Sequence, residues 1–188
     1  MSRKVLVAYA SKMGATAEIA EAIGDELRAR GHEADVRNVA DVAAVTPYDA
    51  VVLGSAIYAG RWRRPAIAFL RRHRDELRQR QVWLFHSGPL GPGKDEDQRI
   101  PASVGRLAHS IGATPPVTFG GRLEPATATG FLARRMAQGE LAGDCRDWPK
   151  IHAWAADISA AITATQRSPW QREPVTRRAK HPAGHFLG

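Results

Sequence analysis

The sequence contains a single cysteine, Cys145, among its 188 residues. One cysteine excludes an internal disulfide and favours a reducing, cytoplasmic setting. No apolar run approaches the roughly 20 residues that a membrane-spanning helix requires. The N-terminus also lacks the charged, apolar and small-residue layout of a secretory signal. We therefore expect a cytoplasmic protein whose only membrane contact is peripheral, at the inner membrane face.

Acidic residues are scarce relative to basic ones, 19 against 27, and the excess is partly local. Residues 166–188 hold five basic residues and one glutamate, contain prolines and show no helical period. We expect a domain over residues 1–165 and a basic, irregular tail after it. A basic surface attracts anionic partners. Nucleic acid is not expected among them, because no recognition helix or RNA-binding motif is present.

Groups that carry out chemistry by themselves are also missing. The seven histidines are scattered, and no carboxylate pair, metal-ligand spacing or nucleophile triad stands out. We therefore expect no catalytic side chain and no metal site. Any reaction must then depend on a bound cofactor.

Strand and helix patterns alternate along the chain, which predicts a parallel sheet with helices on both faces. Five strands in this rhythm fit a three-layer α/β/α fold with the doubly wound order 2-1-3-4-5. Such a sheet binds its ligand beyond the first and third strands. The strands are expected at 3–10, 34–39, 50–53, 81–86 and 117–120, the helices at 17–30, 64–77, 101–111 and 147–164, and a short helical turn at 42–45.

One stretch, residues 121–146, interrupts this alternation between the fifth strand and the last helix. Connections of this length are uncommon in a compact domain and are usually functional. We therefore treat it as a segment inserted into the domain.

The first strand ends at a turn that is typical of an anion site. The apolar run 5–10 is followed by Ser-Lys-Met-Gly-Ala-Thr at 11–16 and then by an amphipathic helix. Unpaired amides and the dipole at a helix start favour a phosphate. The turn is neither a P-loop nor a dinucleotide fingerprint, because their glycine and lysine spacing is absent. Alternatively, Ser11 forms only a local turn and Thr16 only caps the helix.

Two further loops are expected beside this turn, after the third and fourth strands. The first, 54–62, contains small residues and aromatics, and the second, 86–93, is rich in glycine. A planar ring that carries a phosphate needs a stacking surface, backbone groups for its edge and donors for its phosphate. Flavin mononucleotide (FMN) fits this description.

From residue 2 to about 165, the chain resembles the flavodoxin family in the order of these three loops. The resemblance implies a flavodoxin-like fold, FMN as the cofactor and a role in electron transfer. It also implies that the FMN phosphate is bound by Ser11, Lys12, Met13, Gly14, Ala15 and Thr16, and that the isoalloxazine ring is flanked by Ala56, Ile57, Tyr58, Ser87, Gly88 and Pro89.

Residues 54–73 and 120–154 resemble a subgroup, the flavodoxin-like protoporphyrinogen IX dehydrogenases, which are quinone-dependent enzymes of haem biosynthesis. Members carry a basic segment after the fifth strand and then a Gly-Asp…Asp-Trp stretch. Here Arg134 and Arg135 lie in that segment, and residues 143–148 match the stretch. The resemblance implies an FMN-dependent oxidoreductase with a porphyrinogen substrate and menaquinone as acceptor.

Four residues are candidates for contact with such a substrate: Arg61, Trp62, Arg134 and Arg135. Guanidinium groups suit the carboxylates of a porphyrinogen, although a solvated surface is the alternative. Trp62 shields the ring or packs against the next helix. His86 reaches the flavin or is a buried histidine with both nitrogens satisfied.

Three functions remain open from the sequence. The first is the FMN-dependent oxidoreductase, the second a flavodoxin-type electron carrier, and the third a non-enzymatic flavodoxin-like binding module. Typical carriers of the family are acidic, so the basic charge favours the first. The oligomeric state is open.

Overall fold

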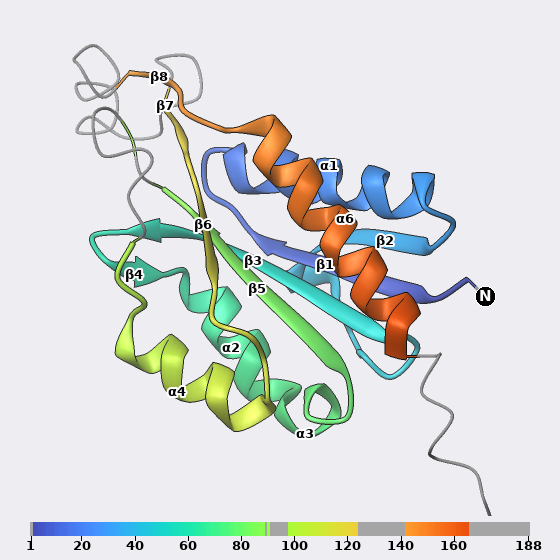
Figure 1. Cartoon of the computed structure of the whole chain (residues 1–188). Coiled ribbons are helices and arrows are strands. Elements are labelled where there is room, and N and C mark those ends of the chain that lie inside the picture. Colours follow the sequence, from blue (N-terminus) through green and yellow to red (C-terminus); the bar gives the residue numbers. More distant parts are fainter. Residues whose placement is uncertain (1, 89, 91–97, 124–141, 166–188) are drawn as a thin grey trace, which may run out of the picture.

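A parallel sheet forms the middle layer of the computed structural model, which describes residues 2–88, 90, 98–123 and 142–165 (Figure 1). Its neighbouring strands pair in parallel, in the order β2-β1-β3-β5-β6. Counted along the chain without the short β4, this is the predicted order 2-1-3-4-5. The strands are β1 (Lys4–Ala10), β2 (Glu33–Asn38), β3 (Ala50–Tyr58), β5 (Gln81–Ser87) and β6 (Val117–Phe119).

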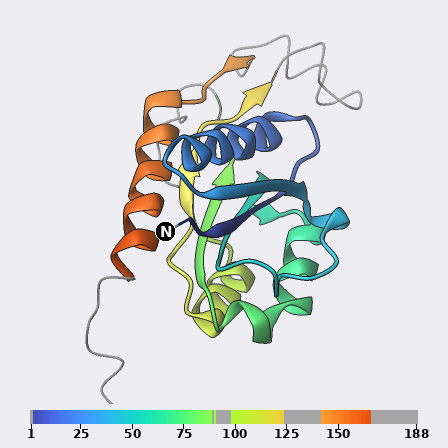
Figure 2. The same cartoon turned by 90° about the vertical axis from the view of Figure 1, so that its right-hand side faces the viewer.

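Helices cover both faces of the sheet, as predicted. Figure 2 shows α1 (Ala15–Ala29) and α6 (Trp148–Ala164) together on one side of the sheet. The opposite side carries α2 (Arg64–Arg72), α3 (Arg74–Leu77) and α4 (Ala102–Ile111). These layers confirm the doubly wound three-layer α/β/α architecture.

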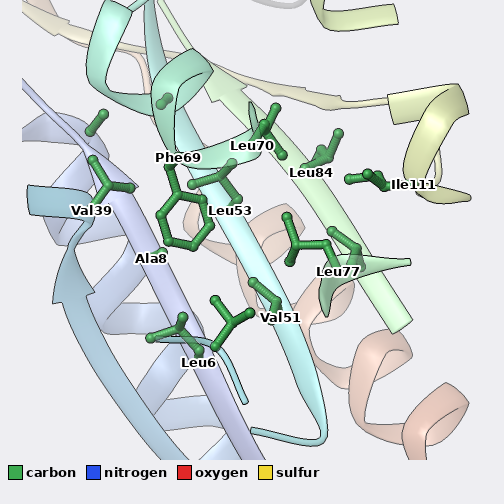
Figure 3. Close-up of a cluster of buried hydrophobic side chains, with 14 of the residues drawn as sticks. Leu6, Ala8, Val39, Val51, Leu53, Phe69, Leu70, Leu77, Leu84 and Ile111 are labelled. Carbon is green, nitrogen blue, oxygen red and sulfur yellow. The ribbon is translucent and has the colours of Figure 1, made fainter. Parts of the chain in front are cut away.

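Each face of the sheet buries its own apolar cluster. In β1, Leu6 points into the cluster beneath α2, α3 and α4, which also contains Leu53 and Leu84 (Figure 3). Its neighbours Val5 and Val7 belong to the cluster beneath α1 and α6. This burial on both sides explains the continuous apolar runs of the central strands.

The third strand differs from the prediction, which ended it before Gly54. Strand β3 continues to Tyr58 and turns back into β4 (Arg61–Trp62) as an antiparallel hairpin. Gly54 lies opposite Phe85 of β5, and a Cβ at residue 54 would lie 2.1 Å from the Cζ of that ring. The glycine therefore makes room for a neighbouring aromatic ring and does not end the strand.

Two helical segments also differ. The short helical turn lies at Val39–Asp41 rather than 42–45, because the Asn38 side chain accepts a hydrogen bond from the Ala40 amide (3.0 Å) and starts the helix there. The expected helix over 64–77 is divided into α2 and α3 at His73, a buried residue whose ring packs 4.8 Å from that of Phe69.

The ends of the inserted segment pair with each other. Strands β7 (Arg122–Leu123) and β8 (Gly143–Asp144) form an antiparallel ladder, and Cys145 donates its amide to Gly121 O (2.9 Å). A Cβ at Gly120 would lie 1.8 Å from the carbonyl oxygen of Cys145. The segment therefore returns tightly against the end of the sheet.

The predicted tail, residues 166–188, lies outside the described residues, and the division at residue 165 stays a prediction. None of the helices in the described part combines the length and apolar character needed to cross a bilayer.

Candidate functional site

A hollow opens where β1, β3 and β5 end. These are neighbouring strands on the two sides of the switch point, where a doubly wound sheet binds its ligand. The loops expected to meet do converge there. The hollow is lined by Ser11, Met13, Ala15, Thr16, Ala56, Tyr58, Ser87, Gly88, Leu90, Gly121 and Arg122.

The turn after β1 has the geometry of an anion site. Gly14 adopts a φ of +91°, which favours glycine, and its amide donates to the Ser11 hydroxyl (3.0 Å). The first hydrogen bond of α1 runs from the amide of Glu18 to Gly14 O (3.0 Å). The amides of residues 15–17 therefore precede the helical ladder at the positive end of the helix dipole.

One hydrogen bond joins this turn to the loop after β5. The hydroxyl of Thr16 lies 2.8 Å from that of Ser87, and both residues are buried. No side-chain cap is present on α1, so the alternative role of Thr16 as a simple helix cap is not observed. Thr16 instead connects two walls of the hollow.

The loops after β3 and β5 approach each other closely because Gly88 has no side chain. A Cβ at residue 88 would lie 2.3 Å from Ile57 Cγ2 and 2.9 Å from the Ile57 carbonyl oxygen. The amide of Gly88 donates to Phe119 O (3.3 Å), which places this glycine beside the next strand as well. Any larger residue at position 88 would push the two loops apart.

Tyr58 provides an aromatic surface at the edge of the hollow. It is 39% exposed to solvent, unlike the other large hydrophobic residues that the structure describes. The ammonium of Lys12 lies 6.0 Å from the centre of its ring. Desolvation raises the pKa of the Tyr58 phenol, against an opposing effect of Arg63. The phenol is therefore neutral at neutral pH.

His86 and Trp62 form a buried chain of hydrogen bonds behind the hollow. Trp62 Nε1–H donates to His86 Nδ1 (3.2 Å), so the proton of the neutral ring lies on Nε2, which donates to Thr118 Oγ1 (2.9 Å). His86 is fully buried and Trp62 is 5% exposed. His86 is thus the buried, satisfied histidine of the two alternatives.

A cluster of charges borders the turn, and the sequence analysis did not identify it. Arg122 forms two hydrogen bonds with Glu18 (2.6 and 3.1 Å), and Arg146 donates to the same carboxylate (2.6 Å). Arg146 also binds Asp144 and holds the pKa of that carboxyl below its usual range. We call Glu18, Arg122, Asp144 and Arg146 the Glu18 cluster.

The predicted site residues are distributed as follows. Most of the cofactor residues line the hollow, while Lys12, Gly14 and Ile57 lie in the same loops. Arg61 is exposed on β4. Pro89, Arg134 and Arg135 lie outside the described residues, and Leu90, Gly121 and Arg122 are lining residues that the prediction missed. No group of three metal-ligating side chains occurs in the described ranges.

A doubly wound sheet with a phosphate-type turn and an aromatic edge at its switch point defines a mononucleotide-binding α/β protein. Residues 6–136 match the flavodoxin domain model, so the chain belongs to the flavodoxin domain family. Flavodoxin domains bind FMN, the cofactor expected from the sequence. No curated protein sequence gives a significant match.

Solved structures share the fold at low sequence identity. A flavodoxin from the domain Archaea has a TM-score of 0.57 at 15% identity, with 85% of this chain and 99% of that chain covered. Flavodoxin 2 from Bacillus cereus has a TM-score of 0.52 at 19% identity, with coverages of 86% and 99%.

Rubredoxin oxygen:oxidoreductase from Desulfovibrio gigas has a TM-score of 0.60 at 13% identity, and the match covers 88% of this chain. The chain spans 37% of the length of that protein. The similarity therefore concerns one part of a larger oxidoreductase and shows the fold alone.

Proposed function

We propose that this protein binds FMN in the hollow and acts as a flavin-dependent oxidoreductase. The observation that carries the proposal is the convergence of the three loops, held together by the Thr16–Ser87 hydrogen bond. A phosphate fits the turn at 11–16, where Gly14 leaves the backbone open. A planar ring fits against the loops at 56–58 and 87–88, which both line the hollow.

The protein's own part in this function is to bind and orient. When bound, FMN supplies hydride and single-electron transfer. The aromatic ring of Tyr58 would offer a stacking surface, and Gly88, which packs against Ile57, lines the same hollow. His86 engages both ring nitrogens within the protein and is fully buried, so it is not available to donate a proton to a substrate.

The substrate we propose is a porphyrinogen with acidic side chains, and the proposed acceptor is a quinone. Support comes from the resemblance of residues 54–73 and 120–154 to protoporphyrinogen IX dehydrogenases. The inserted segment, residues 121–146, begins with Gly121 and Arg122 in the wall of the hollow, and Arg134 and Arg135 belong to that segment. Arg61, exposed on β4, is a further candidate for contact with carboxylates.

The charge of the helical layer formed by α2, α3 and α4 supports an anionic partner. Arg71, Arg74 and Arg106 line a groove between these helices. Such a surface favours an acidic redox partner or peripheral contact with an anionic membrane, where a quinone is found.

A flavodoxin-type electron carrier is the second candidate, because the chain belongs to that family and matches flavodoxins over nearly their whole length. A binding module without redox activity is the third. Typical carriers of the family are acidic, so the arginine-lined groove favours the enzyme.

Reconstitution tests the cofactor. The purified protein is mixed with FMN, dialysed and scanned, and we expect a retained absorbance band near ~450 nm, a property of the flavin itself. A colourless protein after dialysis would exclude the first two candidates together.

Anaerobic titration then separates enzyme from carrier. We expect protoporphyrinogen to bleach the bound flavin and menaquinone to restore its colour. If the flavin stays oxidised with that donor but is reduced by a flavodoxin reductase, the protein is a carrier.

A further inference from the structure

The groove in the helical layer of α2, α3 and α4 lies on the face of the sheet opposite α1 and α6 (Figure 2). Arg71, at the end of α2, and Arg74, at the start of α3, form one side of it. The other side is one face of α4, with Ser103, Arg106, Leu107 and Ser110 at helical spacing. The groove shares no lining residue with the hollow. An occupant of the groove would therefore leave the hollow open.

The positive charge of the groove is not neutralised within the described part of the chain. All three of its arginines are exposed, and no carboxylate that the structure describes forms an ion pair with them. By contrast, Arg3, Arg30 and Arg37 on the same molecule are each paired with a carboxylate. Asp75 and Glu76 of α3 are not among the described lining residues. The groove therefore presents three unpaired guanidinium groups to solvent.

The floor of the groove is less polar than its walls. Leu107 is partly buried and packs against the apolar cluster beneath these helices. The Ser110 hydroxyl donates to Leu107 O (2.8 Å), and Ser103 adds a second half-buried hydroxyl. Guanidinium groups pair with carboxylates through two parallel hydrogen bonds. The lining thus suits a chain that carries several carboxylates and a small amount of apolar surface.

Two other anionic partners fit the groove less well. Stable membrane binding needs apolar insertion as well as charge. Tyr58, the exposed large hydrophobic residue of the described chain, lines the hollow and not the groove. Single-stranded nucleic acid gains much of its affinity by stacking on aromatic side chains, and the described lining contains none. An acidic polypeptide needs neither feature.

We propose that this groove docks an aspartate- and glutamate-rich segment of a partner protein. The inference goes beyond the proposed function, because it concerns a surface on the other face of the sheet and does not depend on FMN. Docking there holds the partner to the protein while the hollow stays accessible to its own ligands. The groove is therefore a site of association and not of electron transfer.

Fluorescence anisotropy with a fluorescein-labelled hexaglutamate peptide tests the proposal at low ionic strength. We expect the wild-type protein to bind the peptide, with an affinity that falls as salt is added. In Arg71→Gln/Arg74→Gln/Arg106→Gln, we expect the affinity to fall about tenfold, since each exposed charge pair contributes about twofold to fivefold. Circular dichroism verifies that this variant is folded.

The matched control removes the same charge elsewhere. In Arg3→Gln/Arg30→Gln/Arg37→Gln, each substituted arginine already has a carboxylate partner, so we expect affinity within about twofold of wild type. Equal losses in the two triple variants would overturn the proposal, because binding would then follow net charge alone. So would a wild-type protein that ignores the peptide but binds phosphatidylglycerol vesicles or an oligothymidine.

Failure of this inference is distinguishable from failure of the proposed function. The groove variant and the wild-type protein should retain FMN equally, with or without the peptide. A protein that binds the peptide through the three arginines but retains no FMN would support the groove and refute the proposed function. A protein that retains FMN but does not bind the peptide would do the reverse.

Discussion

Replacing Gly54 with alanine tests why the central strand contains a glycine. The new Cβ would lie 2.1, 2.5 and 2.6 Å from three atoms of the Phe85 ring, where ordinary contact begins near ~3.4 Å. The ring must therefore retreat by more than about 1 Å. It has little room, because Phe85 is fully buried and packs against Phe119 at 5.7 Å and Trp154 at 5.9 Å.

The expected loss of stability is at the upper end of the overpacking range, about 3 kcal/mol. Phe85→Leu alone shortens the side chain and costs about 1.5 kcal/mol. In the double variant, the leucine leaves space for the new methyl group. We therefore expect the pair to cost much less than the sum of the two changes, with a coupling of about 2–3 kcal/mol.

Urea unfolding monitored by tryptophan fluorescence measures these free energies. Gly105→Ala is a matched control, because a Cβ there lies 3.9 Å from Ile100 Cγ2 within a helix, and alanine is expected to stabilise by about 0.5–1 kcal/mol. The reasoning is refuted if Gly54→Ala is as stable as wild type, or if Phe85→Leu does not rescue it.

Three other changes test the site and the fold. Gly14→Glu places a carboxylate at the turn and should leave the protein colourless after reconstitution with FMN. The control Gly14→Ala suffers only backbone strain of about 1–2 kcal/mol. Normal flavin content in the glutamate variant would contradict the site. Burial lowers the pKa of His73, so the folded state favours the neutral ring. The stability that the neutral ring contributes is complete above pH ~6.5 and is lost as the pH falls, by at most about 1.4 kcal/mol per pH unit. His73→Phe should flatten unfolding free energy between pH 7.5 and 5.5, and an unchanged slope would argue against this. Because Leu123 and Gly143 are paired across an antiparallel ladder, residues 124–142 can be replaced by an Asn-Gly turn. We expect this variant to bind FMN but to lose reduction of the flavin by the porphyrinogen. Equal loss of binding and reduction would mean that the segment has a structural role only.

The sheet order and the place of the hollow could be predicted because local signals determine them. Apolar runs mark the strands, and Gly31 and Gly112, both at positive φ, end helices where the sequence indicated. Asp147, at the expected start of the last helix, caps α6 by accepting a hydrogen bond from the Lys150 amide (3.0 Å).

Two features were missed because each depends on a partner distant in sequence. From the local sequence, Gly54 was predicted to end a strand. The structure shows that a glycine is needed at residue 54 because the Phe85 ring on the adjacent strand occupies the space of a side chain. The ion pair of Arg122 with Glu18 joins residues 104 positions apart, and the sequence around each residue does not indicate its partner. A glycine inside an apolar run and an acidic residue at a phosphate turn were the available signals.

The one sulfhydryl of the chain occupies a useful place. Cys145 is half-buried, its amide is bonded to Gly121, and its carbonyl oxygen lies against Gly120 at the root of the inserted segment. A fluorophore or spin label attached there needs no background mutation, because no second thiol competes for the reagent. The protein therefore carries a natural reporter position for ligand binding in the adjoining hollow, which Gly121 lines.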